Sequence, residues 1–550
     1  MRKIPLSCLC LLAALHVSSA QTASPNTNLT PREDQIIAAA QAEAAPRFNG
    51  ARIVGIRPGT PFLHKLAVTG TRPVTFSANK LPDGLTLDSH TGIITGSLKR
   101  AGEYTVKAAA KNSTGKAKPE IKILCGDTLA LTPPLGWNSY DAFGDNVIES
   151  EVLANARYVA EKLQPVGWDT VVVDYCWSDP GAHDNNRNAR ANAPLAADAF
   201  GRLLPATNRF PSAIDSAGFK PLADAVHALG LKFGIHIMRG TPRQAVTKNL
   251  PVLGTNLRAG DIANPKSICT WLTDMYGVDM TKPGGQAYYD SIVKLCAQWG
   301  VDYIKADDMT SPYQGDEIAA LSQAIKKCGR PIVLSLSPGP APLEQAEDLK
   351  KHAQLWRISG DFWDNWKSLK EQSSLCRAWA PHTVPGHWPD ADMLPLGRIA
   401  IRAEQGNERH TNFTQDEQFT HMTLWSIFRS PLMFGGDLPS NDAFTLSLLT
   451  NDEVLAVDQH STGNHELFAE GNQVAWVASV PNSRDKYLAL FNLDDHAPAT
   501  MRVKWTQLNL SGQCGLRDLW RHKDLGNHDG EFSVKVRPHG AQLLRIRPVG

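Results

Sequence analysis

Two aspartates stand where two apolar segments end. Asp307 closes the segment YIKAD at 303–307, and Asp361 follows the segment WRISG at 356–360. Each segment predicts a buried strand, and one helix-length segment and one further strand lie between them. In a barrel of parallel strands the C-terminal strand ends meet on one face, so we expect the two acids to meet there. Two carboxylates in this position could cleave a glycosidic bond, one as nucleophile or base and the other as acid.

The residue two places before Asp307 is a lysine, and it predicts the charge state of the acid. Alternate residues of a strand point to the same side, so Lys305 and Asp307 would be neighbours. A nearby cation keeps a carboxylate ionised at neutral pH, as a glycosidase nucleophile must be. The alternative is a purely structural ion pair, because buried pairs often serve structure only.

Asp361 has a different sequence environment, because Phe362, Trp363 and Trp366 follow it. Apolar neighbours would exclude water from the carboxyl group and raise its pKa, which suits a proton donor. Two alternatives stay open: Asp361 could be a solvated loop acid, and Arg357 could neutralise it. Arg357 could instead bind a substrate hydroxyl.

Aromatic and polar side chains gather at the predicted strand ends. Tryptophan suits carbohydrate there, because the CH faces of sugars stack on indole rings. The alternative is that the tryptophans fill the mouth of the barrel, and a lone histidine is more often structural than catalytic. The tryptophans at or near strand ends are Trp137, Trp177, Trp356, Trp363 and Trp388. The candidate partners for sugar hydroxyls are Asp174, His236, Arg239, Asp390 and Asp392.

The elements that must position these residues alternate between strand and helix from residue 130 to 455. Eight such alternations predict a (β/α)8 TIM barrel, and a doubly wound open sheet is the alternative. No glycine-rich nucleotide loop follows the first strand, which disfavours the open sheet. Helical periodicity is found, for example, at 149–163, 286–299 and 317–327. The predicted strands are 135–139, 170–175, 232–238, 303–306, 332–337, 355–358, 387–393 and 432–435.

Shorter alternating segments flank the barrel on both sides. Residues 49–126 combine period-two stretches with frequent turn residues, which predicts an Ig-like β-sandwich. We interpret it as a spacer rather than a sugar-binding module, because it has no convergent acids, histidines or aromatics. Residues 460–550 return to alternating strands and predict a C-terminal antiparallel β-sandwich. Residues 21–48 are interpreted as a linker that has room for one helix.

The first twenty residues predict a signal peptide and therefore a secreted or periplasmic protein. Arg2 and Lys3 precede an apolar run from Leu6 to Val17, and the small residues SSA follow at 18–20. A buried N-terminal helix is the alternative. No other segment is long and apolar enough to span a bilayer.

Charge and cysteine content exclude several classes of protein. The formal net charge of the 550 residues is +1, so nothing points to nucleic acid or to an anionic membrane. Seven cysteines lie beyond the predicted signal peptide, so at least one thiol is free, and Cys176 and Cys269 could pair. They form no C-x-x-C pair and no Cys/His cluster, so no metal site is expected.

Five segments resemble glycoside hydrolase family 27, the α-galactosidase or melibiase family, and they cover about 132–463. The segments are TPPLGWNS (132–139), YIKAD (303–307), WRISGD (356–361), WPDADML (388–394) and NDEVLAV (451–457). They are similar, in this order, to the family's opening strand, nucleophile strand, acid/base strand, a sugar-binding segment and the closing helix. Their correct order makes chance agreement improbable.

The resemblance implies a retaining double displacement on an oligosaccharide or polysaccharide, without a metal or an organic cofactor. Asp307 would attack the anomeric carbon. Asp361 would protonate the leaving oxygen and then deprotonate the incoming water. The positions that the resemblance assigns to substrate binding are Trp137, Asp174, His236, Lys305, Arg357, Trp388 and Asp392.

Three positions depart from the α-galactosidase pattern. Two adjacent aspartates usually follow the second strand and read the 4- and 6-hydroxyls, but here Asp174 is followed by Tyr175. His236 replaces a tyrosine of the third strand, and Ser337 stands where the fifth strand usually ends in Glu-Trp. The family's disulfide after the first strand is also absent. A lost hydrogen-bond partner can change sugar preference by orders of magnitude.

The favoured activity is therefore that of a secreted retaining α-galactosidase, with the sugar left open by these departures. Two other activities of the family are alternatives: β-L-arabinopyranosidase and isomaltose-releasing α-glucan hydrolase. From a different class, a non-catalytic carbohydrate-binding protein on a barrel scaffold is also an alternative. It predicts that one of the two acids is dispensable or displaced. The sequence does not determine an oligomeric state.

Overall fold

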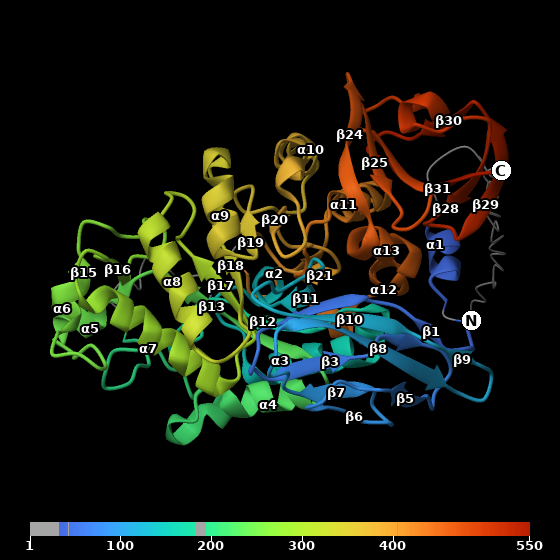
Figure 1. Cartoon of the computed structure of the whole chain (residues 1–550). Helices are drawn as coiled ribbons and strands as arrows, with labels where there is room; N and C mark the ends of the chain where they lie inside the picture. Colours follow the sequence, from blue (N-terminus) through green and yellow to red (C-terminus); the bar gives the residue numbers. More distant parts are fainter. Residues whose placement is uncertain (1–31, 42, 183–193, 404, 550) are drawn as a thin grey trace, which may run out of the picture.

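The computed structural model describes residues 32–41, 43–182, 194–403 and 405–549. The predicted signal peptide and the first part of the predicted linker lie outside these ranges. An Ig-like domain, a central barrel and a C-terminal antiparallel domain follow one another along the chain (Figure 1). The predicted multidomain architecture is confirmed. None of the helices in the described ranges is long and apolar enough to cross a membrane.

Eight parallel strands form the barrel, and each lies where the sequence predicts one. The strands are buried because other elements cover them, which is why β12 reads TVVV without polar alternation. A bridge between Leu394 and Phe434 joins the two ends of the sheet. In sheet order the strands are β20 (Trp388–Asp390), β19 (Leu355–Arg357), β18 (Val333–Leu336), β17 (Tyr303–Asp307), β13 (Lys232–Met238), β12 (Thr170–Val173), β11 (Leu135–Asn138) and β23 (Leu432–Phe434).

Helices connect the barrel strands. α7 ends at Trp299, where Gly300 has φ +89°, a conformation that favours glycine. α11 is buried at every residue from Glu417 to Phe428, because it packs against strands of the C-terminal domain as well as the barrel. The barrel helices are α2 (Tyr140–Phe143), α3 (Glu149–Tyr158), α4 (Lys220–Ala228), α7 (Gly284–Trp299), α8 (Gly315–Lys327), α9 (Ala346–His352), α10 (Trp366–Trp379), α11 (Gln415–Phe428), α12 (Ala443–Thr450) and α13 (Asp452–His460).

An insertion that the sequence did not predict lies between β13 and β17. Its β16 (Met275–Val278) pairs with β14 (Thr241–Pro242) and with β15 (Ala263–Asn264). The insertion also contains α5 (Arg243–Thr247) and α6 (Ala259–Ile262), and it forms one end of the molecule (Figure 1). It contributes Trp271 to the site described below.

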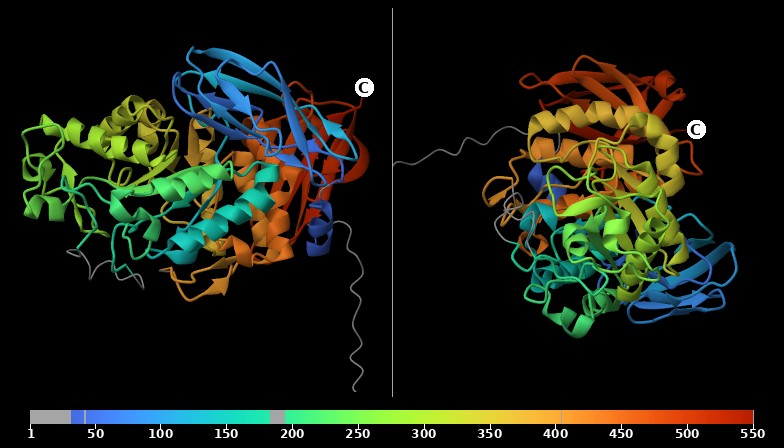
Figure 2. Two further views of the ribbon diagram at one scale, coloured as in Figure 1. Left: turned by 90° about the horizontal axis from the view of Figure 1, so that it is seen from below. Right: turned by 90° about the vertical axis from the view of Figure 1, so that its left-hand side faces the viewer.

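The Ig-like domain covers the N-terminal ends of the barrel strands. A groove between the two domains is lined by Ile53–Ile56 and by the first residues of barrel strands, among them Leu135, Thr170 and Lys232. Figure 2 shows the domain packed along this side of the barrel. Lys65 Nζ donates to the carbonyl oxygen of Leu229 at 3.1 Å. In a TIM barrel this face serves stability rather than catalysis, so the Ig-like domain lies away from the face that carries active sites.

The strands of the Ig-like domain enclose a hydrophobic core of their own. They form two main sheets, of order β2-β10-β8-β5 and β3-β7-β6, with β1 paired to β4 and β9 to β8. The strands are β1 (Arg47–Phe48), β2 (Ile53–Ile56), β3 (Phe62–Lys65), β4 (Val68–Thr69), β5 (Thr75–Asn79), β6 (Leu85–Leu87), β7 (Ile93–Gly96), β8 (Gly102–Lys111), β9 (Lys116–Ala117) and β10 (Glu120–Cys125). Within the predicted linker, α1 (Glu33–Ala39) buries Ile36 in the core of the barrel.

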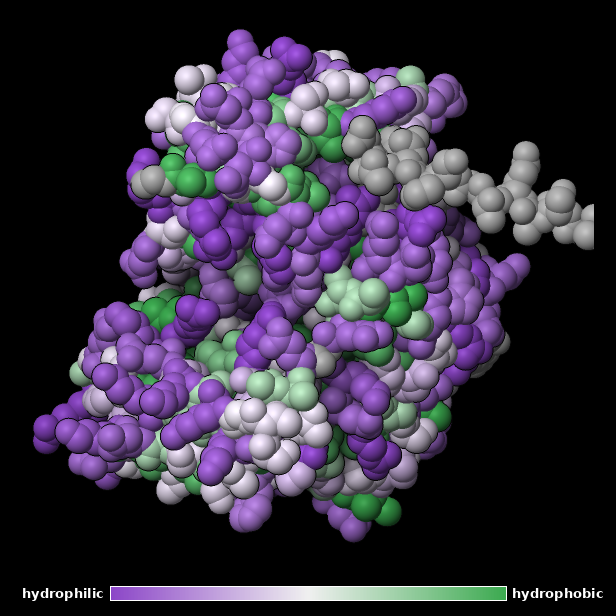
Figure 3. All heavy atoms as spheres, turned by 90° about the vertical axis from the view of Figure 1, so that its right-hand side faces the viewer, coloured by the Kyte–Doolittle hydropathy of each residue, from purple (hydrophilic) through white to green (hydrophobic). Residues whose placement is uncertain are grey.

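The C-terminal domain shares a hydrophobic core with the barrel. Trp476, Trp520 and Leu543 belong to the same buried cluster as the barrel strands, and Trp520 Nε1 donates to Thr423 Oγ1 of α11 at 3.0 Å. The face of the molecule at this end is mainly hydrophilic, with small separate hydrophobic patches (Figure 3). Its sheets have the orders β24-β25-β26-β31-β28-β29 and β27-β30. The strands are β24 (Thr462–Glu470), β25 (Gln473–Ser479), β26 (Lys486–Asn492), β27 (Ala499–Lys504), β28 (Gln513–Asp518), β29 (Lys523–Asp529), β30 (Glu531–Val536) and β31 (Ala541–Pro548).

Candidate active site

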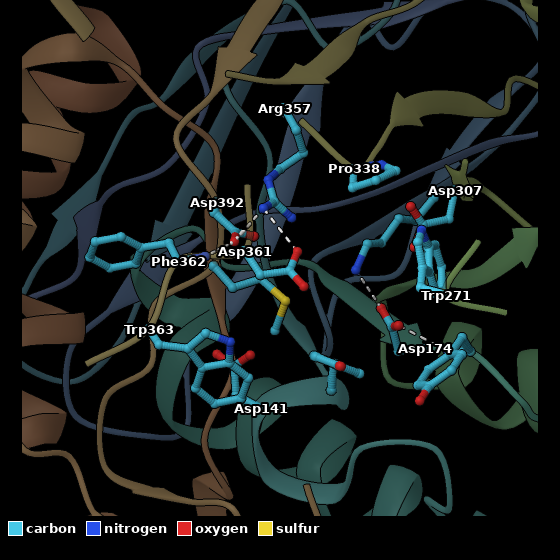
Figure 4. Close-up of a pocket in the computed structure, with 14 residues that line it drawn as sticks. Asp141, Asp174, Trp271, Asp307, Pro338, Arg357, Asp361, Phe362, Trp363 and Asp392 are labelled. Atoms are coloured by element: carbon cyan, nitrogen blue, oxygen red, sulfur yellow. Dashed lines mark hydrogen bonds and ion pairs between the residues drawn. The ribbon is translucent and has the colours of Figure 1, made fainter. Parts of the chain in front are cut away.

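A cavity of about 240 Å³ lies at the C-terminal ends of the barrel strands. Both predicted catalytic acids line it, and they face a shared space from β17 and from the loop after β19 (Figure 4). Its small volume and its mixture of polar and aromatic walls suit one small ligand group rather than an apolar molecule. The lining residues are Tyr140, Asp141, Asp174, Tyr175, Trp271, Lys305, Asp307, Pro338, Arg357, Asp361, Phe362, Trp363, Asp392 and Met393.

Asp307 is held by hydrogen-bond donors from the two strands beside β17. His236 Nε2 on β13 lies 3.1 Å from Asp307 Oδ2, and Ser337 Oγ, just after β18, donates to Asp307 Oδ1 at 3.0 Å. Burial opposes ionisation of Asp307, but the hydrogen bond and charge of His236, with Lys305, outweigh it and hold its pKa below the ordinary value. Asp307 is therefore a positioned carboxylate, the form that a nucleophile requires.

Lys305 is bonded to Asp174 rather than to Asp307. Its Nζ donates to Asp174 Oδ2 at 2.9 Å, and the same oxygen accepts a hydrogen bond from Asn138 Nδ2 at 2.7 Å. Burial favours the neutral form of Asp174, but Lys305 and His236 outweigh it and hold the pKa of Asp174 well below its usual range. The predicted direct pairing of Lys305 with Asp307 is corrected: Lys305 acts on Asp307 by charge, while His236 and Ser337 supply the hydrogen bonds.

Across the cavity from Asp307, Arg357 pairs with two other acids, Asp361 and Asp392. One of its guanidinium nitrogens, Nη2, lies 2.7 Å from Asp392 Oδ2 and 3.2 Å from Asp361 Oδ1. It also donates to the carbonyl oxygen of Gly360 at 2.7 Å, so it fixes the loop that carries Asp361. The sequence left two roles open for Arg357, to neutralise Asp361 or to bind a substrate hydroxyl. Its position is compatible with both, because it pairs with Asp361 and lines the cavity.

The expected burial of Asp361 among aromatic residues is wrong. Its side chain is 57% exposed, so apolar surroundings do not exclude water from it. Of the three aromatic residues that follow, Phe362 and Trp363 both line the cavity, and Phe362 also packs in the core. Trp366 instead donates to Asp495 of the C-terminal domain at 2.8 Å. Asp361 thus has the solvent access that proton exchange with water requires.

The loop after Asp361 is clamped by ionic contacts. Asp364 is buried and accepts from Arg409 Nη2 at 2.6 Å and from Arg409 Nε at 3.0 Å. Arg409 belongs to β22 (Arg409–His410), which pairs with β21 (Arg398–Ile399). Beyond the loop, the Trp366 ring stacks on His539 at 3.8 Å between ring centroids. A neighbouring hairpin and the C-terminal domain therefore both hold the segment that carries Asp361.

The structure corrects the predicted placement of several tryptophans. Trp137 and Trp388 are fully buried and do not line the cavity. Their indole N–H groups donate to backbone carbonyls of Gly436 and Ala130. Strand pleating explains the difference, because residues within a strand alternate between the barrel interior and its helical layer. Of the five predicted strand-end tryptophans, Trp363 lines the cavity, and the four that do not are Trp137, Trp177, Trp356 and Trp388.

His236 does not line the cavity either. It is 2% exposed and lies behind Asp307, so it positions the acid instead of meeting a sugar hydroxyl. Arg239 and Asp390 also stay outside the cavity lining: Arg239 pairs with Asp308 and Glu317, and Asp390 accepts from the backbone N–H of Asp392 at 2.8 Å. The structure brings the other predicted positions together at the cavity, namely Asp174, Lys305, Asp307, Arg357, Asp361 and Asp392.

Sequence reasoning missed the aromatic wall of the cavity. Tyr140 lies 5.5 Å from Tyr175 and 6.2 Å from Trp363 between ring centroids, and Lys305 Nζ lies 5.7 Å from the Tyr140 ring. Trp271 comes from the unpredicted insertion. Tyr140 had a usable signal, because it follows the first barrel strand by two residues. Trp271 had no such signal in the sequence, because it lies outside every predicted strand and helix.

Neither a disulfide nor a metal cluster is present in the described ranges. The seven cysteines of the described chain are unbridged, including Cys176 and Cys269, which lie in one small apolar cluster. No grouping of His, Cys, Asp and Glu in the same part of the chain suits a metal ion. Burial raises the pKa of Cys269 to about 12, which makes it a poor nucleophile at neutral pH.

A barrel with two acids at its C-terminal face and a cavity of this kind defines a glycoside hydrolase, and comparison with known proteins agrees. The family model "Alpha galactosidase A" matches residues 272–460. The model "Alpha galactosidase C-terminal beta sandwich domain" matches 470–546, and the model "Putative Ig domain" matches 49–123. The three matches fall on the three domains described above.

Solved and curated relatives extend this agreement. A GH27 β-L-arabinopyranosidase from Geobacillus stearothermophilus, solved with arabinose, is 50% identical over 76% of this chain and 98% of its own, with a TM-score of 0.75. Alpha-galactosidase 2 of Arabidopsis thaliana is 29% identical over 78% of this chain and 92% of its own. Alpha-galactosidase A of Cellvibrio japonicus is 27% identical over 77% and 93%. The chain belongs to glycoside hydrolase family 27.

Proposed function

We propose that this protein is a secreted, retaining glycosidase that releases terminal β-L-arabinopyranose from oligosaccharides or polysaccharides. β-L-arabinopyranose has the ring configuration of α-D-galactopyranose but lacks the hydroxymethyl group on C5. The two sugars can therefore use the same partners for their ring hydroxyls. The side chains that surround the C5 position therefore determine which of the two sugars is preferred.

The observation that carries this choice is the position of Tyr175. Its aromatic ring lines the cavity, packs edge-on against Tyr140 and His236, and stands where the α-galactosidase pattern has a second aspartate. A hydroxymethyl group loses a carboxylate partner there, whereas a glycone without that group loses nothing. The relative with half of its residues identical, a β-L-arabinopyranosidase, supports the same choice.

α-D-Galactosides are the second candidate substrates. The curated relatives named above are α-galactosidases, and the cavity keeps the Asp174–Lys305 pair among its lining residues. The isomaltose-releasing activity has no comparable observation in its favour. The non-catalytic alternative is disfavoured, because both acids line one cavity in a family of glycoside hydrolases.

The contacts of the two acids support a double displacement. Asp307 Oδ attacks the anomeric carbon while Asp361 gives its proton to the leaving oxygen, so the glycosidic bond breaks and a glycosyl ester forms. Asp361 then removes a proton from water, and the resulting hydroxide opens the ester and restores Asp307. His236 and Ser337 hold Asp307 for the first attack. Arg357 keeps Asp361 at the cavity between proton transfers.

A glycone panel tests the proposed substrate. We expect kcat/KM for nitrophenyl β-L-arabinopyranoside to exceed that for nitrophenyl α-D-galactopyranoside by about tenfold or more, the usual effect of one lost hydrogen-bond partner. Tyr175→Asp should reverse or narrow this ratio, and Tyr175→Phe, which keeps the ring, should preserve it. A wild-type preference for the α-galactoside would reject the arabinopyranoside assignment, and dextran cleavage would reject both.

Single variants of the two acids test the mechanism. Asp307→Ala should lower kcat/KM on the order of 10⁴-fold or more for every substrate, because no second nucleophile replaces it. Asp361→Ala should spare the first step for nitrophenyl glycosides, which need little protonation, and slow substrates with poor leaving groups far more. ¹H NMR of the first-formed sugar should show the substrate's anomeric configuration. Release of the opposite anomer would disprove the retaining mechanism.

Secretion rests on the sequence of residues 1–20 alone. Expression of the full chain in a bacterial host should deliver a mature protein that begins near residue 21 to the periplasm or medium. N-terminal sequencing of that fraction is the measurement. An intact Met1 in an exported or a cytosolic product would contradict the proposal.

A further inference from the structure

Asp141 is a buried acid on the cavity wall with no role so far. It is the second residue of α2, directly after the first barrel strand and its loop. It is 3% exposed and it lines the cavity (Figure 4). Within the described residues, no hydrogen-bond donor reaches its Oδ2 atom. A carboxyl oxygen that is both buried and unpartnered is unusual, because burial of a polar group costs free energy unless a hydrogen bond compensates for it.

The last barrel strand leaves room for this carboxyl group. Gly435 follows β23, and a Cβ atom at this position would lie 1.9 Å from Asp141 Oδ2 and 2.4 Å from its Cγ. The φ of Gly435 is not in the left-handed region, so backbone conformation does not explain the glycine. The close approach of Asp141 does explain it. The fold thus makes space at the cavity wall for an acid whose Oδ2 atom no described residue bonds, and such a buried group calls for an explanation.

The charges that face Asp141 decide which form of the acid the ligand meets. Burial and the neighbouring carboxylates of Asp392, Asp174 and Asp361 raise the pKa of Asp141 well above its ordinary value, and Lys305 opposes them. The raised pKa favours the neutral carboxylic acid form of Asp141. A neutral acid offers one O–H donor and one carbonyl acceptor, which matches a hydroxyl group that can accept and donate in turn.

We propose that Asp141 is a specificity-determining residue that hydrogen-bonds one hydroxyl group of the sugar bound in this cavity. The proposal rests on the proposed function only in that the ligand is a sugar, and it holds for either glycone. Asp141 lies among the residues that surround the two catalytic acids, so its partner is a hydroxyl of the glycone ring rather than of the leaving group. The interaction orients the ring and does not take part in proton transfer.

A deoxy-sugar series tests the proposal. The wild type and Asp141→Ala are assayed with the nitrophenyl glycoside that the wild type cleaves best and with its 2-, 3- and 4-deoxy analogues. We expect Asp141→Ala to lower kcat/KM for the parent glycoside by about 10- to 100-fold, the worth of one buried hydrogen bond. For one deoxy analogue alone the variant and the wild type should agree within about threefold, because the lost hydroxyl and the lost acid are the same interaction.

Two further variants separate recognition from folding. Asp141→Asn keeps the shape, a donor and an acceptor, so it should retain kcat/KM within about tenfold of the wild type. Asp145→Asn changes a buried acid that does not line the cavity, and its deoxy-sugar profile should equal that of the wild type. If Asp141→Ala does not fold, the same series is run on Asp141→Asn, in which the matching analogue should still show the smallest difference.

Two results would overturn the proposal. In the first, Asp141→Ala keeps the parent kcat/KM within about threefold at an unchanged melting temperature. In the second, the variant loses the same factor on the parent and on all deoxy analogues, which indicates a structural role. Failure of the proposed function gives a different result, because the wild type would then prefer another glycone. The comparison of Asp141→Ala with the wild type on that glycone and its deoxy analogues would still test the role of Asp141.

Discussion

The proposed nucleophile, Asp307, depends on two residues that do not line the cavity. Asp307 receives hydrogen bonds from His236 and Ser337, and Lys305 is occupied by Asp174. The side chains at positions 236 and 337 differ from the α-galactosidase pattern, yet both now bond the carboxylate that must attack. These two departures therefore concern the state of Asp307 more than the choice of sugar. Position 175, which lines the cavity, is the departure that bears on the glycone.

A pH profile tests the support that His236 gives to Asp307. The pKa of Asp307 is held below its ordinary value, partly by His236, so kcat/KM should fall only as the pH drops through that low pKa. His236→Ala removes a hydrogen bond worth about 1.5–3 kcal/mol, which raises the pKa of Asp307. The acid limb of kcat/KM should therefore move up by about one pH unit or more.

His236→Gln is the matched control for this profile, since an amide keeps an N–H donor but carries no charge. Its acid limb should lie between those of the wild type and His236→Ala. His236 contacts the carboxylate of Asp307, so a shift confined to the acid limb identifies Asp307 as the titrating group. An acid limb at the same pH in all three proteins would show that His236 does not set the ionisation of the nucleophile.

At the scale of elements, the loop after β19 is the part of the site that the barrel does not hold by itself. It carries Asp361 at the cavity, and its Asp364 is clamped by Arg409 of β22. Trp366 at its far end reaches the C-terminal domain. Asp361, the proposed acid/base, therefore depends on three separate parts of the molecule for its position, whereas Asp307 depends on adjacent barrel strands.

Substitution of Arg409 tests the ionic contact that holds Asp364, and the neighbouring Arg398 provides a control. Arg409→Ala leaves the buried carboxylate of Asp364 without its ionic partner, which should lower the free energy of unfolding by about 3 kcal/mol. It should also reduce kcat more than it changes KM, because Asp361 loses its fixed position. Urea denaturation and steady-state kinetics measure the two effects.

Arg398→Ala is the control for this variant. Arg398 lies on the paired strand β21 and binds Glu408, whose side chain is half exposed. Exposed pairs contribute at most about 1 kcal/mol, so stability and kcat should remain close to those of the wild type. Equal losses in Arg398→Ala and Arg409→Ala would mean that the hairpin as a whole, rather than the clamp on Asp364, matters.

At the scale of the whole molecule, the two flanking domains relate to the barrel in different ways. The Ig-like domain has a core of its own and rests on the N-terminal strand ends. The C-terminal domain shares its core with the barrel. We therefore expect calorimetry to resolve two unfolding transitions, one for the Ig-like domain and one for the barrel with the C-terminal domain.

Two core variants assign these transitions. Val106→Ala in the Ig-like core should lower one transition by the cost of a small cavity, roughly 1–3 kcal/mol, and leave glycosidase activity unchanged. Trp520→Ala in the shared core should lower the other transition by about 3–5 kcal/mol and reduce activity at the same temperature. A single transition that both variants shift equally would contradict this division.

The sequence predicts the barrel well because its strands are continuous apolar runs, and period and burial agree at all eight. It predicts for the same reason that Asp307 and Asp361 meet at one cavity, since both are close to strand ends. The sequence does not predict which side chains line the cavity or are exposed where this depends on the tertiary packing of other elements. Trp137 faces away from the cavity, while Tyr140, the first residue of α2 just after the same strand, lines it. Trp271 lies in an insertion without periodicity, and the exposure of Asp361 depends on where Trp366 goes.

The order of strands in the C-terminal sheet has a consequence for biosynthesis. β31 lies between β26 and β28 in the middle of that sheet, and its Leu543 joins the core that covers α11. The ribosome makes β31 after every other strand of the described chain, so α11 keeps an exposed apolar face until β31 emerges. A premature stop codon shortly before residue 541 would therefore leave a nascent chain prone to aggregation, even though every residue of the catalytic cavity had already been translated.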